Sequence, residues 1–141
     1  MPSFTHLRVA SAFSAHYGTG RPEALVAAAS SMGMSSASIT DRDGLYGAVR
    51  HIRACLAASI APIVGSTLRL NEREGTPAGR ITILAHGNTN GRGWASLARS
   101  ITSAHGASGK RNLGAAPALR RDRVARLLRG PEGIDVTVLL G

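Results

Sequence analysis

Short apolar runs alternate along this chain with longer stretches in which apolar residues recur every three or four positions. The short runs are typical of buried strands, and the longer stretches of helices with one apolar face. The pattern predicts strands at 4–10, 36–40, 62–70, 81–85 and 134–140. It predicts helices over 22–32, 45–56, 94–101 and 117–129. Strands that mostly alternate with helices indicate an α/β fold, with a mostly parallel sheet or barrel and the helices outside it.

The segments between these elements are expected to be connections. Residues 71–79 are polar and contain Pro and Gly, which predicts a surface loop. Residues 105–116 are rich in Gly and Ala and are expected to be mobile. Residues 87–93 carry three glycines between a strand and a helix, where backbone amides could meet a phosphate. Because they lack the Walker and dinucleotide-binding patterns, a plain flexible turn is the favoured interpretation.

The segment 36–56 is expected to organise the fold as a strand, a turn and a helix. Thr40, Asp41 and Asp43 gather at the carboxyl end of the strand. In α/β folds ligand-handling residues collect at that end, because adjacent strand ends open into one crevice. Asp43 followed by Gly44 suits a turn and a helix cap. The apolar face expected for the helix consists of Leu45, Val49, Ile52 and Leu56.

Composition narrows the class of protein. A length of 141 residues predicts one domain or a piece of one, and no apolar stretch is long enough to span a membrane. The single Cys55 excludes an intramolecular disulfide and fits a reducing cytoplasm. The net charge of +9 favours polyanionic neighbours, nucleic acid ahead of membrane, although a general compositional bias toward Ala, Gly and Arg is the favoured explanation of the charge. Aromatic residues make up 4% of the chain, too few to suggest a base-stacking platform.

Candidate chemistry is sparse. His6 and Arg8 share one face of the first predicted strand, but arginine stays protonated and cannot bind a metal ion, so His6 fits a half-buried, hydrogen-bonded histidine better. Asp41 and Asp43 could hold a divalent cation or act as acid and base, or could form a capped turn paired with Arg42.

The four other histidines have no partners at metal-ligand spacing, and His51, off the apolar face of its helix, is expected to be solvated. The serines Ser11 and Ser14 lack the context of a nucleophile elbow.

Several segments together resemble a known family. They are 4–11, 13–14, 17–18, 22–26, 39–49 and 63–65, followed by 83–85 and 93–97. In order and spacing they resemble the PHP domain at the N-terminus of bacterial C-family DNA polymerases, the DNA polymerase III alpha subunit, in particular its actinobacterial forms. The resemblance is dense over 1–105 and thin over 106–141, which predicts a single PHP-like domain at 1–141. It implies an incomplete, barrel-like (β/α)7 fold, and a chain truncated at Gly141.

The resemblance also implies where a metal cluster would stand. In active members divalent ions such as zinc or manganese support phosphoester hydrolysis, including 3′–5′ exonuclease activity. Here one histidine position is kept, while most other ligand positions carry residues that are poor ligands. The positions matched to that site are His6, Arg8, Tyr17, Asp41, Arg42, Thr67 and Arg80. We therefore predict no bound metal ion, no cofactor and no catalytic residue, with Arg8, Arg42 and Arg80 neutralising the two aspartates.

The function predicted on this basis is that of a structural and interaction module in a DNA polymerase III alpha-like protein. The polymerase palm carboxylates of such an enzyme do not lie in this chain, so the chain alone should not polymerise DNA. Its expected partners are other polymerase domains or replication subunits in the cytoplasm, with DNA possible through the positive charge and no membrane. Two alternatives stay open: a small metal-dependent PHP phosphoesterase or 3′–5′ exonuclease, and a basic nucleic-acid-binding module.

Overall fold

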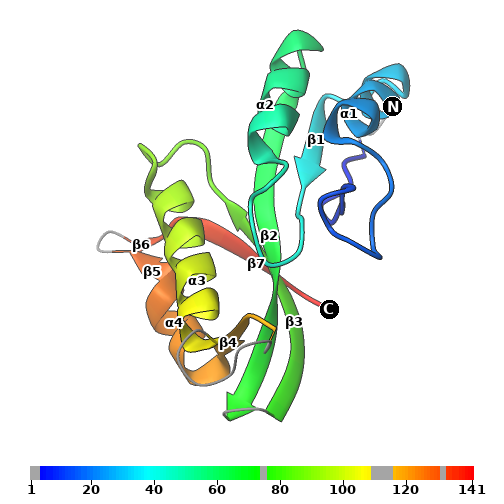
Figure 1. Ribbon diagram of the computed structural model, residues 1–141. Coiled ribbons are helices and arrows are strands. Elements are labelled where there is room, and N and C mark those ends of the chain that lie inside the picture. The colour runs from blue at the N-terminus through cyan, green and yellow to red at the C-terminus, as the bar shows by residue number, and fades with distance from the viewer. Residues whose placement is uncertain (1–3, 74–75, 109–115, 131–132) are drawn as a thin grey trace. The chain divides into compact units, whose positions relative to one another are not determined.

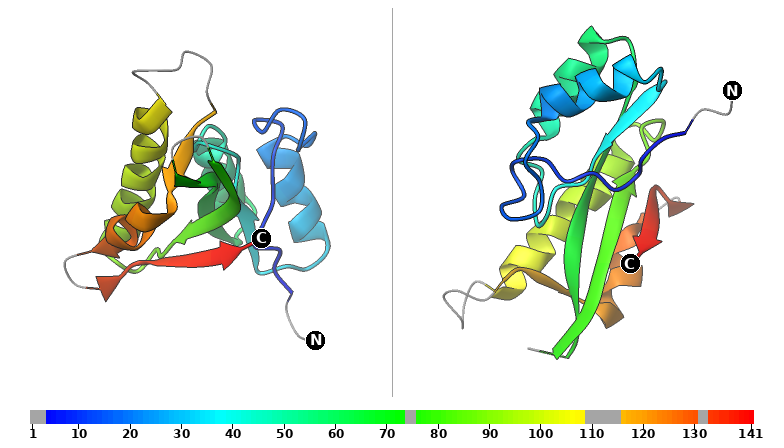
Figure 2. Two further views of the ribbon diagram at one scale, coloured as in Figure 1. Left: turned by 90° about the horizontal axis from the view of Figure 1, so that it is seen from below. Right: turned by 90° about the vertical axis from the view of Figure 1, so that its right-hand side faces the viewer.

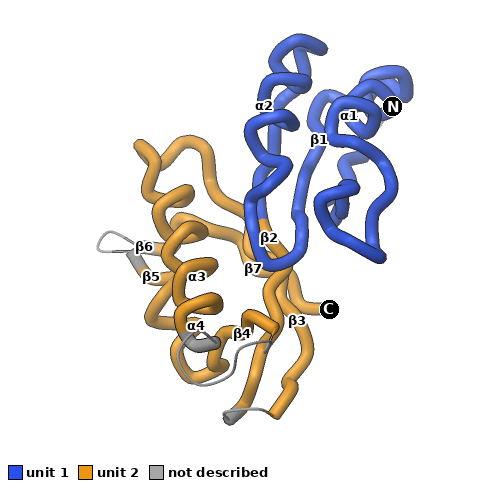
Figure 3. Tube along the Cα trace, viewed as in Figure 1, with its two compact units in different colours: residues 1–65 blue, residues 66–141 orange. Residues whose placement is uncertain are grey.

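The computed structural model describes residues 4–73, 76–108, 116–130 and 133–141. The chain divides into two compact units, Met1–Gly65 and Ser66–Gly141, which are coloured separately in Figure 3. The strand β2 (Ala61–Arg73) begins in unit 1 and continues into unit 2. The mixed α/β architecture agrees with the fold class predicted from the sequence.

Unit 1 packs two helices against a parallel strand pair. Helix α1 (Pro22–Ser31) starts with a proline at its first position, where a missing amide costs nothing. Strand β1 (Ser36–Ile39) pairs in parallel with the start of β2, from Ser36 opposite Ala61 to Ile39 opposite Val64. Helix α2 (Ala48–Ala57) lies against both α1 and β1 (Figure 1). The core of unit 1 consists of Val26, Ala29, Ala37, Cys55 and Ile60.

The predicted first strand, 4–10, is wrong: the segment runs beside β1 without forming a strand. The amide of Thr40 donates to the carbonyl of Val9 over 2.8 Å, and the amide of Val9 donates to the Thr40 hydroxyl over the same distance. The Ser38 hydroxyl donates to the carbonyl of His6 over 2.6 Å. Side-chain hydroxyls thus replace part of a backbone ladder, which the alternation of residues in 4–10 does not reveal.

Helix α2 buries a different face from the one predicted. It begins at Ala48, and its buried residues are Ala48, His51 and Cys55. Val49 and Leu56, placed on the apolar face by their spacing, are 61% and 67% exposed. The buried face carries the small residues Ala48 and Cys55 together with His51, whose ring is hydrogen-bonded to the Ala37 carbonyl of β1, so this contact with β1 decides the face more strongly than the count of large apolar residues.

The turn before α2 also differs from the prediction. Asp43 adopts a left-handed conformation, with φ of 58°, within the turn. It does not cap α2, because the N-cap residue is Gly47 and no side chain caps that end.

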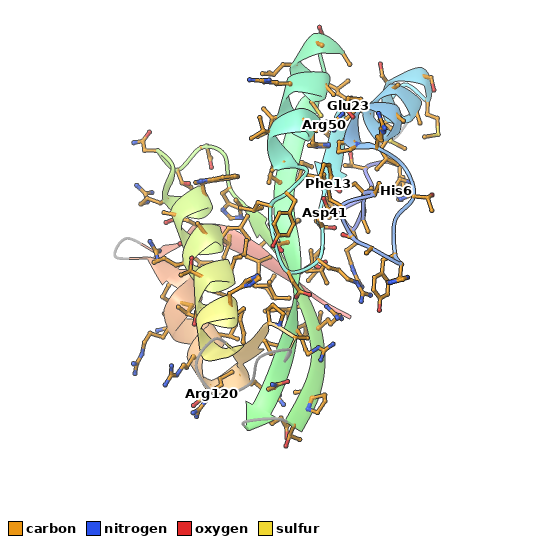
Figure 4. The ribbon with its side chains drawn as sticks, in the orientation of Figure 1. His6, Phe13, Glu23, Asp41, Arg50 and Arg120 are labelled. Atoms are coloured by element: carbon orange, nitrogen blue, oxygen red, sulfur yellow. The ribbon has the colours of Figure 1, made fainter. Side chains whose placement is uncertain are left out.

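An exposed ion pair joins the two helices of unit 1. Arg50 of α2 pairs with Glu23 of α1, and this contact keeps the pKa of Glu23 below its usual value (Figure 4).

Unit 2 is built on an antiparallel hairpin covered by helices (Figure 2). Strand β3 (Thr76–Ala85) lies between β2 and β7 (Val136–Leu140). The pairing with β7 is antiparallel, from Ile81 opposite Leu140 to Ala85 opposite Val136. The short β4 (Ala118–Arg120) runs parallel to β2. The remaining elements are α3 (Arg92–Ser108), α4 (Arg121–Leu128), β5 (Arg129–Gly130) and β6 (Gly133–Ile134).

Two predicted boundaries in unit 2 are corrected. Most of the expected loop 71–79 is strand, because β2 extends to Arg73 and β3 starts at Thr76; residues 74–75 lie outside the described residues. The expected helix 117–129 starts as β4 and becomes helical at Arg121. Of the expected mobile segment, 105–108 belongs to α3 and 109–115 lies outside the described residues. No helix within the described ranges combines the length and apolar character needed to cross a membrane.

Candidate functional site

The carboxyl end of β1 holds a buried carboxylate surrounded by serine groups. Asp41 is 1% exposed, and its Oδ1 accepts hydrogen bonds from the Ser11 amide and the Ser14 hydroxyl, both over 2.7 Å. The Ser11 hydroxyl donates to both carboxylate oxygens, over 3.0 and 2.8 Å. We call Ser11, Ser14 and Asp41 the serine–aspartate cluster; Figure 4 labels Asp41 and the neighbouring Phe13. Its hydrogen bonds tie the loop after residue 10 to the end of β1.

Neighbouring groups extend this cluster. The Ser14 hydroxyl accepts from the Arg42 amide over 2.9 Å, so this residue bridges Asp41 and the next turn. The Arg42 guanidinium stacks on the Tyr17 ring, with Cζ 2.9 Å from the ring centroid. A Cβ added to Gly47 would lie 2.8 Å from Asp41 Oδ2, so a glycine is needed for the backbone to pass the carboxylate.

The predicted pair at the N-terminus does not form a site of its own. His6 and Arg8 are both exposed, and the His6 ring makes an edge contact with Phe4 at 4.7 Å between centroids. The expectation that the His6 side chain would be half-buried is therefore wrong. Only its backbone is anchored, through the bond from Ser38 described above.

The two predicted positions in unit 2 lie on neighbouring strands of its hairpin. Thr67 of β2 is buried, and its hydroxyl shares a hydrogen bond of 2.9 Å with that of Thr82 in β3. Arg80 of β3 is half-buried. This threonine pair makes a polar cross-strand contact inside the unit, a pairing that sheets commonly use.

The residues present do not fit the metal cluster implied by the resemblance. Among the described residues, no three His, Cys, Asp or Glu side chains are gathered closely enough to hold one ion. Histidine, cysteine and carboxylate side chains are the ligands that zinc and manganese take from proteins. Asp41, the buried carboxylate of the serine–aspartate cluster, has both oxygens engaged by serine donors instead.

The glycine-rich segment 87–93 is an ordered turn that starts α3. The Thr89 hydroxyl donates to the carbonyl of His86 and accepts from the Gly93 amide, each over 2.9 Å. Arg92 and the buried Asp135 form an ion pair of 3.1 Å beside it. Because Thr89 satisfies the amide of Gly93, the segment forms the start of α3, which agrees with the favoured interpretation as a turn.

His51 corrects another prediction: it is 1% exposed rather than solvated. Its Nε2 lies 3.0 Å from the carbonyl of Ala37 and 3.5 Å from the Cys55 sulfur. Burial lowers the pKa of His51, with the Ala37 carbonyl and the Asp41 charge opposing that effect in part. Burial also raises the pKa of the Cys55 thiol, so this buried cysteine is a core residue rather than a nucleophile.

The lowered pKa of His51 gives a testable pH dependence. Below the ordinary value of 6.5 the unfolded chain takes up a proton that the folded chain resists. The free energy of unfolding is therefore expected to fall as the pH drops from 7.5 to 5.5, as measured by urea denaturation. His51→Gln should flatten that slope, and an equally steep slope in this variant would contradict the assignment.

Comparison with known proteins identifies the family. The family model described as "PHP domain" matches residues 6–128, which is most of the chain. The chain belongs to the PHP domain family. The resemblance seen in the segments before residue 105 is thereby confirmed, and the match takes in parts of both compact units.

Curated relatives of this PHP domain carry the name error-prone DNA polymerase. The protein of Symbiobacterium thermophilum is 42% identical over 103 residues, which cover 73% of this chain and 9% of the relative. That of Anaeromyxobacter dehalogenans is 37% identical over 125 residues, covering 88% and 10%. That of Mycobacterium tuberculosis is 33% identical over 114 residues, covering 77% and 10%. The chain thus spans about a tenth of the length of these relatives and is homologous to their N-terminal region.

A solved structure supports the fold alone. An amidohydrolase from Chromobacterium violaceum, with bound sulfate and no metal, superposes with a TM-score of 0.50 at 18% identity. The match covers 72% of this chain and 33% of that protein. The PHP domain of this chain therefore shares the general strand and helix arrangement of a larger amidohydrolase-type fold.

Proposed function

We propose that this PHP domain is a non-catalytic structural and interaction module of an error-prone-type DNA polymerase. The observation that carries the proposal is the serine–aspartate cluster. The Asp41 carboxylate at the end of β1 accepts hydrogen bonds from the Ser11 amide and from the hydroxyls of Ser11 and Ser14. These bonds hold the loop after residue 10 against the end of β1. A carboxylate used in this way stabilises the fold without contributing to hydrolysis.

The basic side chains at former ligand positions support the same proposal. Arg8, Arg42 and Arg80 place fixed positive charge at positions where the family resemblance puts metal ligands. An arginine cannot lose its proton to coordinate an ion, and its charge offsets that of nearby carboxylates. We infer that Arg8 and Arg42 take over, within unit 1, the charge balance that metal ions provide in active members.

The proposed partners are the other domains of the polymerase or further replication subunits. The relatives named error-prone DNA polymerase are about ten times longer than the aligned region, so this domain would have neighbours on the same chain. The proposed location is the cytoplasm, where a protein acting on bacterial DNA would work and where a single buried cysteine stays reduced.

The proposal is tested on the purified chain by two measurements. After dialysis, zinc and manganese are quantified by plasma mass spectrometry, with an expected content well below one ion per chain. Hydrolysis of bis(p-nitrophenyl) phosphate is then followed with added manganese, and no rate above that of buffer with manganese is expected. His6→Ala serves as the control for the one kept histidine position. Stoichiometric metal, or a manganese-dependent rate that this variant loses, would establish the phosphoesterase alternative and refute the proposal.

A further inference from the structure

Positive charge is concentrated in unit 2. Twelve of the 17 basic residues lie between 66 and 141, against five of the eight acidic residues. Five of these arginines fall within the ten residues 120–129, together with a single aspartate. This segment contains α4 (Figure 1), and the helix itself carries three of the five arginines.

Two of the five arginines are already paired. Arg120, labelled in Figure 4, forms an ion pair of 2.6 Å with Asp122. Arg121 forms an ion pair of 3.1 Å with Glu72 of β2. These pairs use the acidic residues on α4 and on the adjacent part of the hairpin.

The other three arginines, Arg123, Arg126 and Arg129, are exposed, and we call them together the arginine face. Arg123 and Arg126 lie on α4, and Arg129 directly follows the helix. Within the described part of the chain, no carboxylate lies within ion-pair distance of any of them. Arg123 and Arg126 are three positions apart and therefore neighbours on the helix surface. Leu128, the buried last residue of α4, lies about 140° and 160° around the helix from Arg123 and Arg126, so both arginines lie on the side away from the core.

We propose that the arginine face binds the phosphate backbone of nucleic acid. The one carboxylate on α4, Asp122, is paired with Arg120, although its charge also acts on the neighbouring Arg123. Like charges at neighbouring helix positions destabilise a helix slightly, and a bound polyanion removes that cost. Guanidinium groups also match phosphate geometry, because their donors form a planar fork. This proposal is independent of the metal content and hydrolytic activity of the domain.

The surroundings favour phosphate contacts over base readout and over a membrane. Four of the five aromatic residues lie in unit 1, and the remaining one, Trp94, lies on α3, so the arginine face has no aromatic side chain of its own for stacking on bases. A membrane-surface helix inserts a free apolar face, whereas the large apolar residues of α4, Val124, Leu127 and Leu128, are partly or fully buried against its own unit. We therefore expect binding that depends strongly on salt and little on sequence.

The test is fluorescence anisotropy with a labelled duplex and a labelled single strand, both of mixed sequence, titrated with the full chain at 50 to 200 mM salt. The test variant is Arg123→Gln/Arg126→Gln. The matched control is Arg21→Gln/Arg53→Gln, which removes two exposed arginines from unit 1 and so lowers the net charge equally. Arg123→Lys/Arg126→Lys keeps the charge, and circular dichroism verifies the fold of each variant.

We expect the test variant to bind duplex DNA about 10-fold more weakly near 0.1 M salt. The slope of log affinity against log salt should shrink by about 1.8 for the duplex and about 1.4 for the single strand. The control and the lysine variant should stay close to the wild type in slope. Equal losses in the test variant and the control would overturn the proposal, as would an absence of wild-type binding at 50 mM salt. Binding to phosphatidylserine vesicles that requires the two arginines, with DNA binding unaffected, would also overturn it.

Discussion

Replacing Gly93 by alanine is expected to lower the free energy of unfolding by about 3 kcal/mol, the upper part of the usual range for overpacking. A Cβ at this position would lie 2.6 Å from the carbonyl oxygens of Asp135 and His86, and 2.7 Å from the His86 nitrogen. These are backbone atoms, and the His86 amide donates to the Asp135 carbonyl over 3.0 Å. Relief of the clash would break that bond, which holds the end of β3 to the segment before β7. Urea denaturation followed by circular dichroism measures the loss.

Gly106 provides the matched control for that substitution. It lies in the same helix, α3, and nothing stands within 4 Å of the place where its Cβ would be. Alanine is a better helix former than glycine, so Gly106→Ala should raise the free energy of unfolding by about 0.5 to 1 kcal/mol. The same replacement in one helix is thus expected to have opposite signs. A small effect of Gly93→Ala would show that β3 and β7 separate easily at that end.

The elements that the sequence predicts well are those whose signals are local. The strand at 36–40 and the helix at 22–32 are found almost to the residue, because an apolar run, a helix-starting Pro22 and a terminating Gly33 mark them. The hairpin between β2 and β3 is missed because its distal half is exposed and polar, and it is held by backbone pairing that no side-chain pattern records. The face of α2 is missed because the polar His51 is buried on it, held by a hydrogen bond to the Ala37 carbonyl that residue spacing does not reveal.

The candidate site shows the same division. Asp41 is picked out correctly as a residue at a strand end, since parallel strand ends are recognisable from sequence. Its partners Ser11 and Ser14 are missed, because they lie 30 and 27 residues away along the chain and a serine hydroxyl carries no local signal of a distant carboxylate. The sequence offers only an indirect signal for such partners. A carboxylate that directly follows a buried strand needs hydrogen-bond donors from elsewhere in the chain.

Asp41→Ala is expected to be the most destabilising substitution in unit 1, with a loss of about 4 kcal/mol. It leaves three buried donors without their acceptor: the Ser11 amide, the Ser11 hydroxyl and the Ser14 hydroxyl. Each buried donor left unsatisfied costs about 1 to 3 kcal/mol, and the rotatable hydroxyls recover part of the loss. The control is Asp122→Ala on exposed α4, where a loss within about 0.5 kcal/mol is expected.

Variants of the serine–aspartate cluster also test whether Asp41 stabilises the fold through hydrogen bonds or binds a metal ion. If Asp41 acts only through Ser11 and Ser14, the single changes Ser11→Ala and Ser14→Ala should each cost a part of the loss seen in Asp41→Ala. Adding EDTA should leave the urea midpoint of the wild type unchanged, because no ion contributes to its stability. A midpoint that falls in EDTA for the wild type, but not for Asp41→Ala, would mean that this carboxylate binds a metal ion. In that case the serines would orient a ligand instead of replacing one.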